Sequence, residues 1–310
     1  MTLRQAQDGS ETRCGLVAVI GAPNAGKSTL VNQLVGQKVA ITSAKAQTTR
    51  ARMLGIALHK SEEADTQMVL IDTPGIFSPK RKLDRAMVSA AWDGTESADA
   101  VLLMVDPIKQ RRHELEPLVE ALAKRPERKI LVLNKVDAAK KEPLLALAQE
   151  LAEKVEFAEV YFVSALTSDG VPELKESLAA MMPEGPWMYP EDQVSDASER
   201  LLATEITREQ LYKQLHEELP YDSAVRPEKY IQRPDGSVEI HQQIVVMRDN
   251  QRAIVLGKGG SRIKEIGTAA REELSELLGQ KVHLFLHVKT DERWSEDKEM
   301  FEEMGLEWKG

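Results

Sequence analysis

The sequence predicts an α/β domain built on a mostly parallel, six-stranded sheet, followed by a smaller α+β domain. In the first half, short apolar runs alternate with stretches of helical periodicity, which is the pattern of a parallel sheet covered by helices. The second and third apolar runs leave no room for a crossover helix, so they should pair as an antiparallel hairpin at one edge. The second half instead follows the order helix, two strands, two helices, strand.

These patterns give the expected elements in order. Strands of the first domain are expected at Gly15–Ile20, Arg52–His59, Gln67–Ile71, Ala100–Val105, Lys129–Leu133 and Val160–Val163. Its helices are expected at Lys27–Val35, Lys82–Asp93, Arg111–Lys124, Glu142–Lys154 and Pro172–Met181. In the second domain we expect helices at Ser198–Glu218 and Ser261–Leu278, and strands at Ala224–Gln232, Ser237–Met247 and Val282–Val288. Because Pro227 lies in the first of these strands, that strand should be an edge strand or start late.

A length of 310 residues suggests two domains. Pro183-Glu184-Gly185-Pro186, followed by Pro190 and acidic residues, is typical of a linker. We therefore expect an N-terminal extension (1–13), a first domain (14–183), a linker (184–198), a second domain (199–290) and an acidic tail (291–310).

The composition indicates a soluble protein of a reducing compartment. Cys14 is the one cysteine, so no internal disulfide can form. Met1–Arg13 is polar and unlike a signal peptide, and no run approaches the ~18 apolar residues of a transmembrane helix. We expect a cytoplasmic location, and peripheral membrane association stays open.

Charge is unevenly distributed along the chain. The formal net charge of −9 argues against nucleic-acid binding by the chain as a whole. Ser223–Lys264, however, carries eight Lys and Arg against four acids, and this stretch surrounds a glycine-rich loop. Asp291–Gly310 carries three basic and eight acidic residues, and we expect this tail to be solvated rather than folded onto the loop.

The strongest functional signal is a phosphate-binding loop between the first strand and the first helix. It comprises Gly21, Ala22, Pro23, Asn24, Ala25, Gly26, Lys27, Ser28 and Thr29, which fits G-x-x-x-x-G-K-[ST]. In this context, backbone N–H groups converge on phosphate oxygens at a helix N-terminus. Lys27 should reach the β- and γ-phosphates, and the Ser28 hydroxyl should bind Mg²⁺.

Three further motifs follow strands, at the sheet edge where open α/β sheets bind ligands. They are Asp72-Thr73-Pro74-Gly75, Asn134-Lys135-Val136-Asp137 and Val163-Ser164-Ala165. Asp72 could hold Mg²⁺ through water, and Gly75 could donate its N–H to a γ-phosphate. The Asp137 carboxylate could accept from guanine N1–H and the 2-amino group, a donor pair that adenine lacks.

The remaining residues of these motifs have supporting roles. Asn134 could bond the base edge and tie down the phosphate loop, and the Lys135 stem could cover the base face. The Ala165 N–H could meet the guanine O6. Each motif alone is compatible with a solvated turn, but their order at successive strand ends predicts one nucleotide site.

Together these motifs resemble a phosphate-loop GTPase domain over roughly Gly15–Met182. Within that superfamily, the phosphate loop, Gln47-Thr48-Thr49-Arg50 and Asp72-Thr73-Pro74-Gly75-Ile76 resemble the branch of the bacterial Era proteins. The resemblance implies that one threonine closes over Mg²⁺ and the γ-phosphate; we assign this role to Thr49, with Thr48 as the alternative. The expected metal ligands are then Ser28, Thr49 and Asp72.

The attacking water must be positioned for GTP hydrolysis in a different way from that of Ras-like enzymes. Ile76 stands where Ras-like enzymes carry a water-orienting glutamine, and an aliphatic side chain cannot orient water. Relatives with an asparagine at the position of Asn24 use it to help hold K⁺ near the β/γ-phosphate bridge. We therefore expect Lys27, Thr49, Gly75 and Asn24 to act in slow hydrolysis of GTP, with K⁺ as a possible cofactor. The alternative is that Asn24 only shapes the loop.

The glycine-rich loop of the second half predicts an RNA contact. The residues assigned to RNA binding are Gly257, Lys258, Gly259, Gly260, Arg262 and Lys264. Glycines allow the RNA backbone to approach, and the basic side chains can neutralise phosphates. Ile254, Val255, Ile263 and Ile266 are expected to form a floor under the bases. The order of elements resembles a type II KH domain, although a G-x-x-G loop alone could also serve protein contacts.

A GTPase domain joined to a type II KH domain resembles the Era family over about Gly15–Thr290. That resemblance implies binding of small-subunit ribosomal RNA near its 3′ end, a role in small-subunit assembly, and loose association with the inner membrane. We expect a monomer that binds GTP, GDP and Mg²⁺. Two alternatives are an RNA-binding assembly factor with a structural nucleotide site, and a GTPase that assists tRNA modification. The second alternative would need an extra catalytic domain or a reactive terminal cysteine.

Overall fold

The computed structural model describes residues 11–43, 45, 48–50, 52–79, 81–109, 112–216 and 219–308. The expected roles of Gln47, Arg111 and residues 1–10 therefore lie outside the described part. The chain forms two compact units. The first extends through Asp196, except for Ile41–Thr48 and Arg81–Ala86, which group with the chain from Ala197 onward in the second unit.

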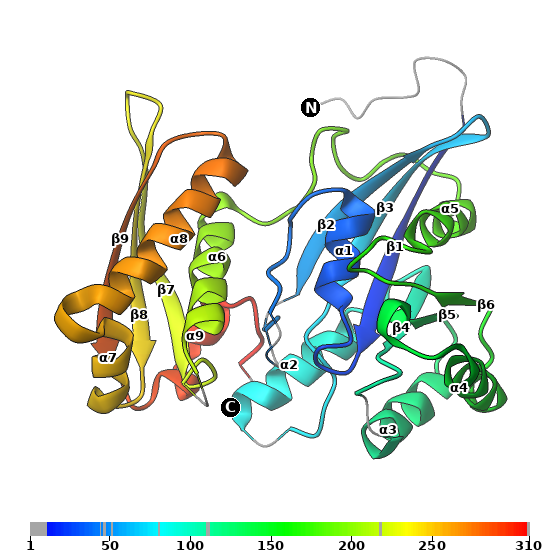
Figure 1. Ribbon diagram of the computed structural model, residues 1–310. Helices are drawn as coiled ribbons and strands as arrows, with labels where there is room; N and C mark the ends of the chain where they lie inside the picture. Colours follow the sequence, from blue (N-terminus) through cyan, green and yellow to red (C-terminus); the bar gives the residue numbers. More distant parts are fainter. Residues whose placement is uncertain are drawn as a thin grey trace. The chain divides into compact units, whose positions relative to one another are not determined.

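A six-stranded sheet forms the centre of the first unit (Figure 1). Its strands are β1 (Glu11–Gly21), β2 (Met53–Lys60), β3 (Ala64–Asp72), β4 (Ala100–Val105), β5 (Arg128–Leu133) and β6 (Glu159–Phe162). The spatial order is β2-β3-β1-β4-β5-β6. All neighbouring pairs are parallel except β2 and β3, so the expected antiparallel hairpin at the edge is confirmed.

Helices cover both faces of this sheet, because each buried strand is apolar on both sides. The helices are α1 (Lys27–Val35), α2 (Lys82–Asp93), α3 (Arg112–Ala123), α4 (Lys141–Lys154) and α5 (Val171–Met181). In β1, Val17 and Val19 pack with residues of α1 and α5, whereas Ala18 and Ile20 pack with residues of α3 and α4. The two-residue period of the strand thus builds two cores, and all four side chains are 0% exposed.

The segment expected to be a linker is packed against the first sheet. The Gln67 carboxamide oxygen accepts from the N–H groups of Met188 (2.9 Å) and Tyr189 (3.0 Å). The Ile56 N–H donates to the Val194 carbonyl at 2.8 Å. The structural boundary consequently falls after Asp196 rather than at 183/184, because these residues satisfy polar groups of the sheet. At the other end, residues 11–13 begin β1 rather than forming an extension.

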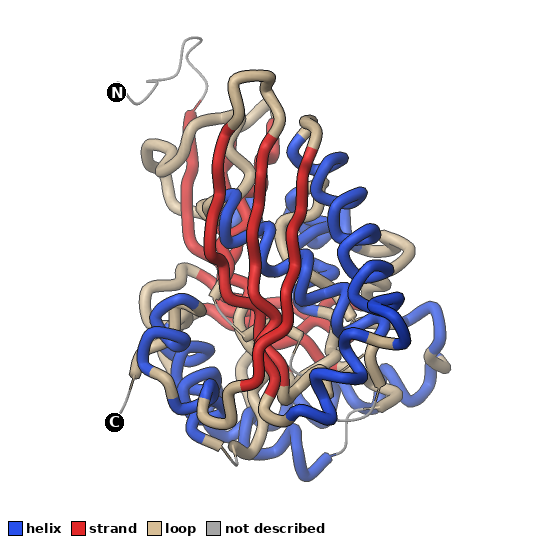
Figure 2. Tube along the Cα trace, turned by 90° about the vertical axis from the view of Figure 1, so that its left-hand side faces the viewer, coloured by secondary structure: helices blue, strands red, loops and turns tan. Residues whose placement is uncertain are grey.

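The second unit contains a three-stranded sheet of order β7-β8-β9 with helices on one face. Its elements are α6 (Glu199–Gln214), β7 (Ser223–Gln232), β8 (Val238–Val246), α7 (Asp249–Leu256), α8 (Ser261–Leu278) and β9 (Val282–Thr290). Figure 2 looks toward the strands of this sheet. As expected from Pro227, β7 is an edge strand, and its register with β8 shifts between Pro227 and Lys229.

Residues of α6 and α8 bury this sheet on the side they cover. Ile206 of α6 and Ala270 of α8 pack with Ile240 of β8. Ile266 of α8 and Ile244 of β8 belong to the neighbouring cluster. The order helix, two strands, two helices and strand is the one that the sequence predicts. Among the described residues, no helix combines the length and the apolar character needed to cross a bilayer.

The acidic tail is folded, so the expectation of a solvated tail is wrong for residues 291–308. Trp294, Met300, Phe301 and Leu306 are at most 3% exposed, and Lys298–Glu303 forms helix α9. The acids pair with Arg226 of β7, whose guanidinium lies 2.9 Å from Asp297 and 3.1 Å from Glu303. Four apolar side chains spaced among the acids explain this packing, because their burial favours a folded segment.

Candidate functional site

The phosphate loop joins β1 to α1 through backbone conformations that favour glycine. Gly21 has φ of 151° and Gly26, the N-cap of α1, has φ of 97°. A Cβ on Gly21 would lie 2.3 Å from the Met104 carbonyl oxygen, and one on Gly26 would lie 2.2 Å from the Asn134 amide nitrogen. Asn24 also has positive φ, at 62°, which asparagine tolerates better than most residues. The loop therefore curls tightly in front of the helix N-terminus.

The Lys27 ammonium lies inside this loop. Its Nζ donates to the carbonyls of Gly21 (3.2 Å) and Ala22 (3.0 Å), and the residue is 6% exposed. Burial lowers the pKa of Lys27 to about 8, and the nearby Asp72 carboxylate opposes that shift. An ammonium has three donors, so Lys27 can hold the loop and still offer a hydrogen bond and its charge to a phosphate.

Three oxygen-bearing side chains meet beside Lys27. The Ser28 hydroxyl is 2.6 Å from Asp72 Oδ2 and 2.8 Å from Thr49 Oγ1. Two hydroxyls and a buried carboxylate form the oxygen-rich donor set that Mg²⁺ prefers, so these residues fit the metal. The structure thus places Thr49, and not Thr48, beside Ser28; the Thr48 hydroxyl donates instead to the Lys45 carbonyl at 2.8 Å.

The Asp72-Thr73-Pro74-Gly75 motif is held directly against the phosphate loop. The Thr73 hydroxyl donates to the Val19 carbonyl at 2.7 Å, and the Ile76 N–H donates to the Gly21 carbonyl at 3.0 Å. Gly75 approaches so closely that a Cβ there would lie 2.7 Å from Pro23. These contacts place Gly75 directly beside the phosphate loop.

Asn134 connects three loops from a buried position. Its amide donates to the Ala25 carbonyl at 2.8 Å, and its oxygen accepts from the Ala165 N–H at 2.9 Å. The expected tie to the phosphate loop is present. The Ala165 N–H, which we expected to meet guanine O6, bonds Asn134 in this structure. Ser164, the residue before Ala165, is 0% exposed.

Lys135 lies over the phosphate loop, and its ion-pair partner, Asp106, belongs to none of the motifs found in the sequence. Its Nζ donates to the Asn24 carbonyl at 2.8 Å and pairs with Asp106 Oδ2 at 2.6 Å. Burial raises the pKa of Asp106, but hydrogen bonds from Lys135 and two backbone N–H groups outweigh it, so the pKa is lowered overall. Asp106 directly follows β4, so its place at a strand end could have identified it as a site residue from the sequence. Val136 and Asp137 follow in a short 3-10 turn, with the Asp137 side chain exposed.

The RNA loop of the second unit lies between α7 and α8. Lys258 and Lys264 are exposed, as phosphate contacts require. Arg262 is instead half-buried, and its Nη1 donates to the Gln214 carbonyl at 3.0 Å. The expected apolar floor is only partly present, because Val255 and Ile266 are 0% exposed core residues, whereas Ile254 is 56% exposed.

Comparisons with known proteins agree with this geometry. A family model described as a 50S ribosome-binding GTPase matches residues 16–135, and a KH-domain model matches residues 218–295. A GTPase Era of Erythrobacter litoralis is 81% identical over 297 residues, which cover 96% of this chain and 98% of the relative. The chain belongs to the Era GTPase family.

Solved Era structures match nearly the whole length of the chain. An Era variant of Aquifex aeolicus bound to GDP and AlF4⁻ is 37% identical, with a TM-score of 0.88, and the match covers 94% of this chain and 99% of that one. An Era in complex with MgGDPNP and nucleotides 1506–1542 of 16S ribosomal RNA gives the same TM-score and identity, over 95% and 99%. This Era-family chain is therefore a GTPase with a C-terminal KH domain.

The lowered pKa of Lys27 predicts how nucleotide affinity depends on pH. A bound phosphate favours the ammonium form, so binding takes up a proton wherever the free lysine is neutral. The affinity for GDP in Mg²⁺ should therefore fall about fourfold between pH 7.0 and 8.5, from the linkage relation with a free-protein pKa near 8. Fluorescent GDP titrations measure this. The Lys27→Met variant should bind more weakly and without this fall; a fall of equal size in that variant would refute the assignment.

Proposed function

We propose that this chain is a GTP-hydrolysing switch that binds small-subunit ribosomal RNA near its 3′ end and acts in small-subunit assembly. The observation that carries the proposal is the meeting of Ser28, Thr49 and Asp72 beside Lys27, at the edge where Asn134 and Asp137 also lie. The Era complex with MgGDPNP and a 16S RNA fragment supports the RNA partner.

The site residues divide into groups that hold the nucleotide and groups that aid hydrolysis. Bound Mg²⁺ would supply positive charge to the β- and γ-phosphates, and Ser28, Thr49 and Asp72 would hold it. Lys27 and the N–H of Gly75 would stabilise charge on the γ-phosphate. Because Ile76 cannot orient water, intrinsic turnover should be slow.

Base selection tests the nucleotide half of the proposal. Asp137→Ala removes a carboxylate that would accept two hydrogen bonds from guanine, so GTP affinity should fall about a hundredfold. ATP affinity, already weak, should not change. Calorimetric titration with both nucleotides checks this, and phosphate release should vanish in Lys27→Ala. Full GTP affinity in Asp137→Ala, or a preference of the natural chain for ATP, would exclude the proposed site.

We further propose that K⁺ serves as a second cation at Asn24. The proposal is supported by the place of Asn24 in the phosphate loop and by Ile76 at the position of a water-orienting glutamine. A K⁺ near the β/γ bridge would supply charge that an arginine supplies in other GTPases.

Replacing Na⁺ by K⁺ should then raise the GTP turnover rate by about tenfold. Asn24→Gly should abolish the difference, and glycine is the better substitution because φ is 62° at this position. Steady-state phosphate release in the two salts at equal ionic strength measures the effect. Equal rates in K⁺ and Na⁺, or an unchanged K⁺ effect in Asn24→Gly, would leave Asn24 with a loop-shaping role.

The KH loop offers a well-controlled test of RNA binding. Gly259 has φ of 62°, and no atom lies within 4 Å of the position that a Cβ would take, so Gly259→Asp meets no neighbouring atom, carries the backbone strain of a positive φ, and adds a negative charge where RNA phosphate is expected. Gly236, in the β7–β8 turn, has φ of 79° and equally open surroundings. Affinity for a 16S 3′-end RNA should fall about tenfold or more in Gly259→Asp and stay unchanged in Gly236→Asp. Equal losses in both variants would assign the RNA contact to another surface.

The proposed setting is the cytoplasm, where the chain would act as a monomer on the small ribosomal subunit and contact the inner membrane peripherally. Family membership supports this setting. The tRNA-modification alternative gains no support from the thiol, because Cys14 is buried in β1 and burial raises its pKa. The structural-nucleotide alternative is tested by the phosphate-release measurement described above.

A further inference from the structure

Two segments that adjoin residues of the nucleotide site in the sequence fold as part of the second unit. The 41–48 segment ends at Thr48, and the next residue, Thr49, contacts Ser28. The 81–86 segment begins five residues after Ile76, whose N–H donates to Gly21, and it forms the start of α2. Neither segment carries a residue that we assign to phosphate, metal or RNA, so both need another explanation.

The described residues of the 41–48 segment contact α6 along its length and at its C-terminal end. Ile41 is 3% exposed and packs in the core with Ala203 and Ile206. The Thr42 N–H donates to Glu209 Oε1 at 2.8 Å. The Lys45 ammonium donates to the carbonyls of Tyr212 and Leu215.

These carbonyls belong to the end of α6, where the helix dipole favours a cation and carbonyls lack intrahelical partners. Arg262, the second residue of α8, donates to the Gln214 carbonyl at the same helix end. Lys45 and Arg262 therefore bind neighbouring carbonyls at the end of α6. This helix end is held both by Lys45 of the 41–48 segment and by α8, the helix that follows the RNA loop.

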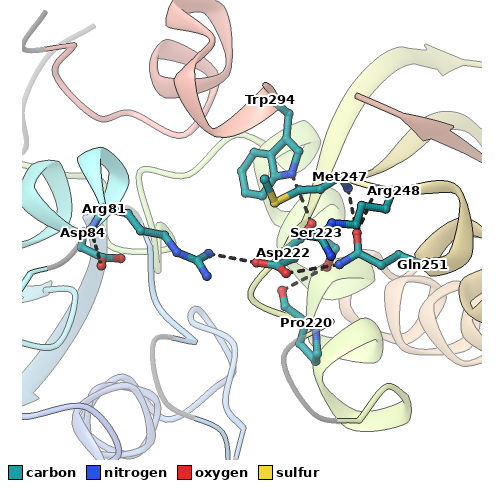
Figure 3. A network of polar contacts seen from close by, with 9 residues as sticks. All are labelled: Arg81, Asp84, Pro220, Asp222, Ser223, Met247, Arg248, Gln251 and Trp294. Carbon is teal, nitrogen blue, oxygen red and sulfur yellow. Dashed lines mark hydrogen bonds and ion pairs between the residues drawn. The ribbon is translucent and has the colours of Figure 1, made fainter. Parts of the chain in front are cut away.

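The 81–86 segment is connected to the other helix beside the RNA loop (Figure 3). Arg81 Nη1 is 2.9 Å from Asp222 Oδ1, and Asp222 Oδ2 accepts from Gln251 Nε2 at 3.2 Å. The Gln251 oxygen in turn accepts from the N–H groups of Met247 and Arg248, both at 3.0 Å, at the start of α7. The Asp222 carbonyl is held by Trp294 Nε1 at 3.2 Å.

We propose that Lys45 and Arg81 are positioning residues for RNA binding: they hold α8 and α7, respectively, and so make the position of the Gly257–Gly260 loop depend on the segments that flank the nucleotide pocket. Lys45 acts through the end of α6 and Arg262. Arg81 acts through Asp222 and Gln251. The inference rests on the proposed function, since it concerns how nucleotide state changes RNA affinity.

The direction of the effect follows from the position of Thr49. These contacts coexist with Thr49 beside Ser28, which is the arrangement expected for a site closed on Mg²⁺ and a γ-phosphate. They should therefore favour RNA binding in the triphosphate state and contribute little in the GDP state. Arg81 is 54% exposed in its side chain, so its ion pair is solvent-screened and the change should be small.

The test measures RNA affinity of the full chain with GDPNP and with GDP. The probe is an RNA copying nucleotides 1506–1542 of 16S ribosomal RNA, and the readout is the ratio of the two dissociation constants. Arg81→Gln should shift this ratio toward one by about threefold. Arg85→Gln, which removes the same charge from an exposed position in the helix that directly follows Arg81, should not change it.

Lys45 provides the second arm. Lys45→Met should shift the ratio about threefold, and Lys45→Arg should preserve it, because arginine can still donate to helix carbonyls. The double variant Lys45→Met with Arg81→Gln should approach a shift of about tenfold. Nucleotide affinity, RNA-free hydrolysis and the melting temperature should remain those of the natural chain.

The outcomes separate this inference from the proposed function. If the natural chain binds neither GTP nor this RNA, the proposed function fails. If it binds both with a nucleotide-dependent ratio that the Lys45 and Arg81 variants keep, or lose equally with Arg85→Gln, the inference alone fails. A natural chain whose RNA affinity is the same with GDPNP and GDP also overturns the inference and leaves the proposed function standing.

Discussion

The buried amide of Asn134 is the interaction on which the nucleotide site depends. It bonds the Ala25 carbonyl of the phosphate loop and the Ala165 N–H after β6, so loops from three strand ends share one side chain. The same amide requires glycine at position 26, because a Cβ there would lie 2.2 Å from its nitrogen. Replacing it would leave a buried carbonyl and a buried N–H unpaired, each at a cost of about 1–3 kcal/mol. The phosphate loop and the loops after β5 and β6 are therefore held together by one side chain.

The electrostatics of the site follow from that compactness. Closing the loop around Lys27 removes its ammonium from water, and this lowers its pKa to about 8 despite the neighbouring Asp72. A buried cation without a full set of strong partners is costly in the free protein. A triphosphate restores the favourable environment, so part of the nucleotide's binding energy comes from relieving this cost. Lys135 differs from Lys27, because its ammonium pairs with the Asp106 carboxylate at 2.6 Å and this contact orients it over the loop.

Most of the fold and of the nucleotide site could be predicted from sequence because both depend on local patterns. Short apolar runs that alternate with stretches of helical periodicity predict the six-stranded sheet. The phosphate loop, Asp72 and Asn134 lie at strand ends, where a parallel sheet brings them together. The packed tail could not be predicted in the same way. Its acids suggested solvation, whereas its folding depends on Trp294 and Phe301 meeting a distant surface. The role of Gln67 in holding Met188 and Tyr189 is likewise a long-range contact without a local signature.

The contacts that Lys45 and Arg81 make in the second unit are individually weak, and a switch needs contacts of this strength. A salt bridge with one solvent-exposed partner, such as Arg81 in its pair with Asp222, contributes about 0–1 kcal/mol, and a cation at a helix end about 0.3–1 kcal/mol. Contacts of that size can be gained and lost at little cost, whereas the apolar cores of both units cannot. Combined, the Lys45 and Arg81 contacts amount to about 0.3–2 kcal/mol, which overlaps the range of about 1–3 kcal/mol typical of coupling between two sites. A stronger connection would hold the RNA loop in one position whatever nucleotide was bound, and the nucleotide would then no longer act as a signal.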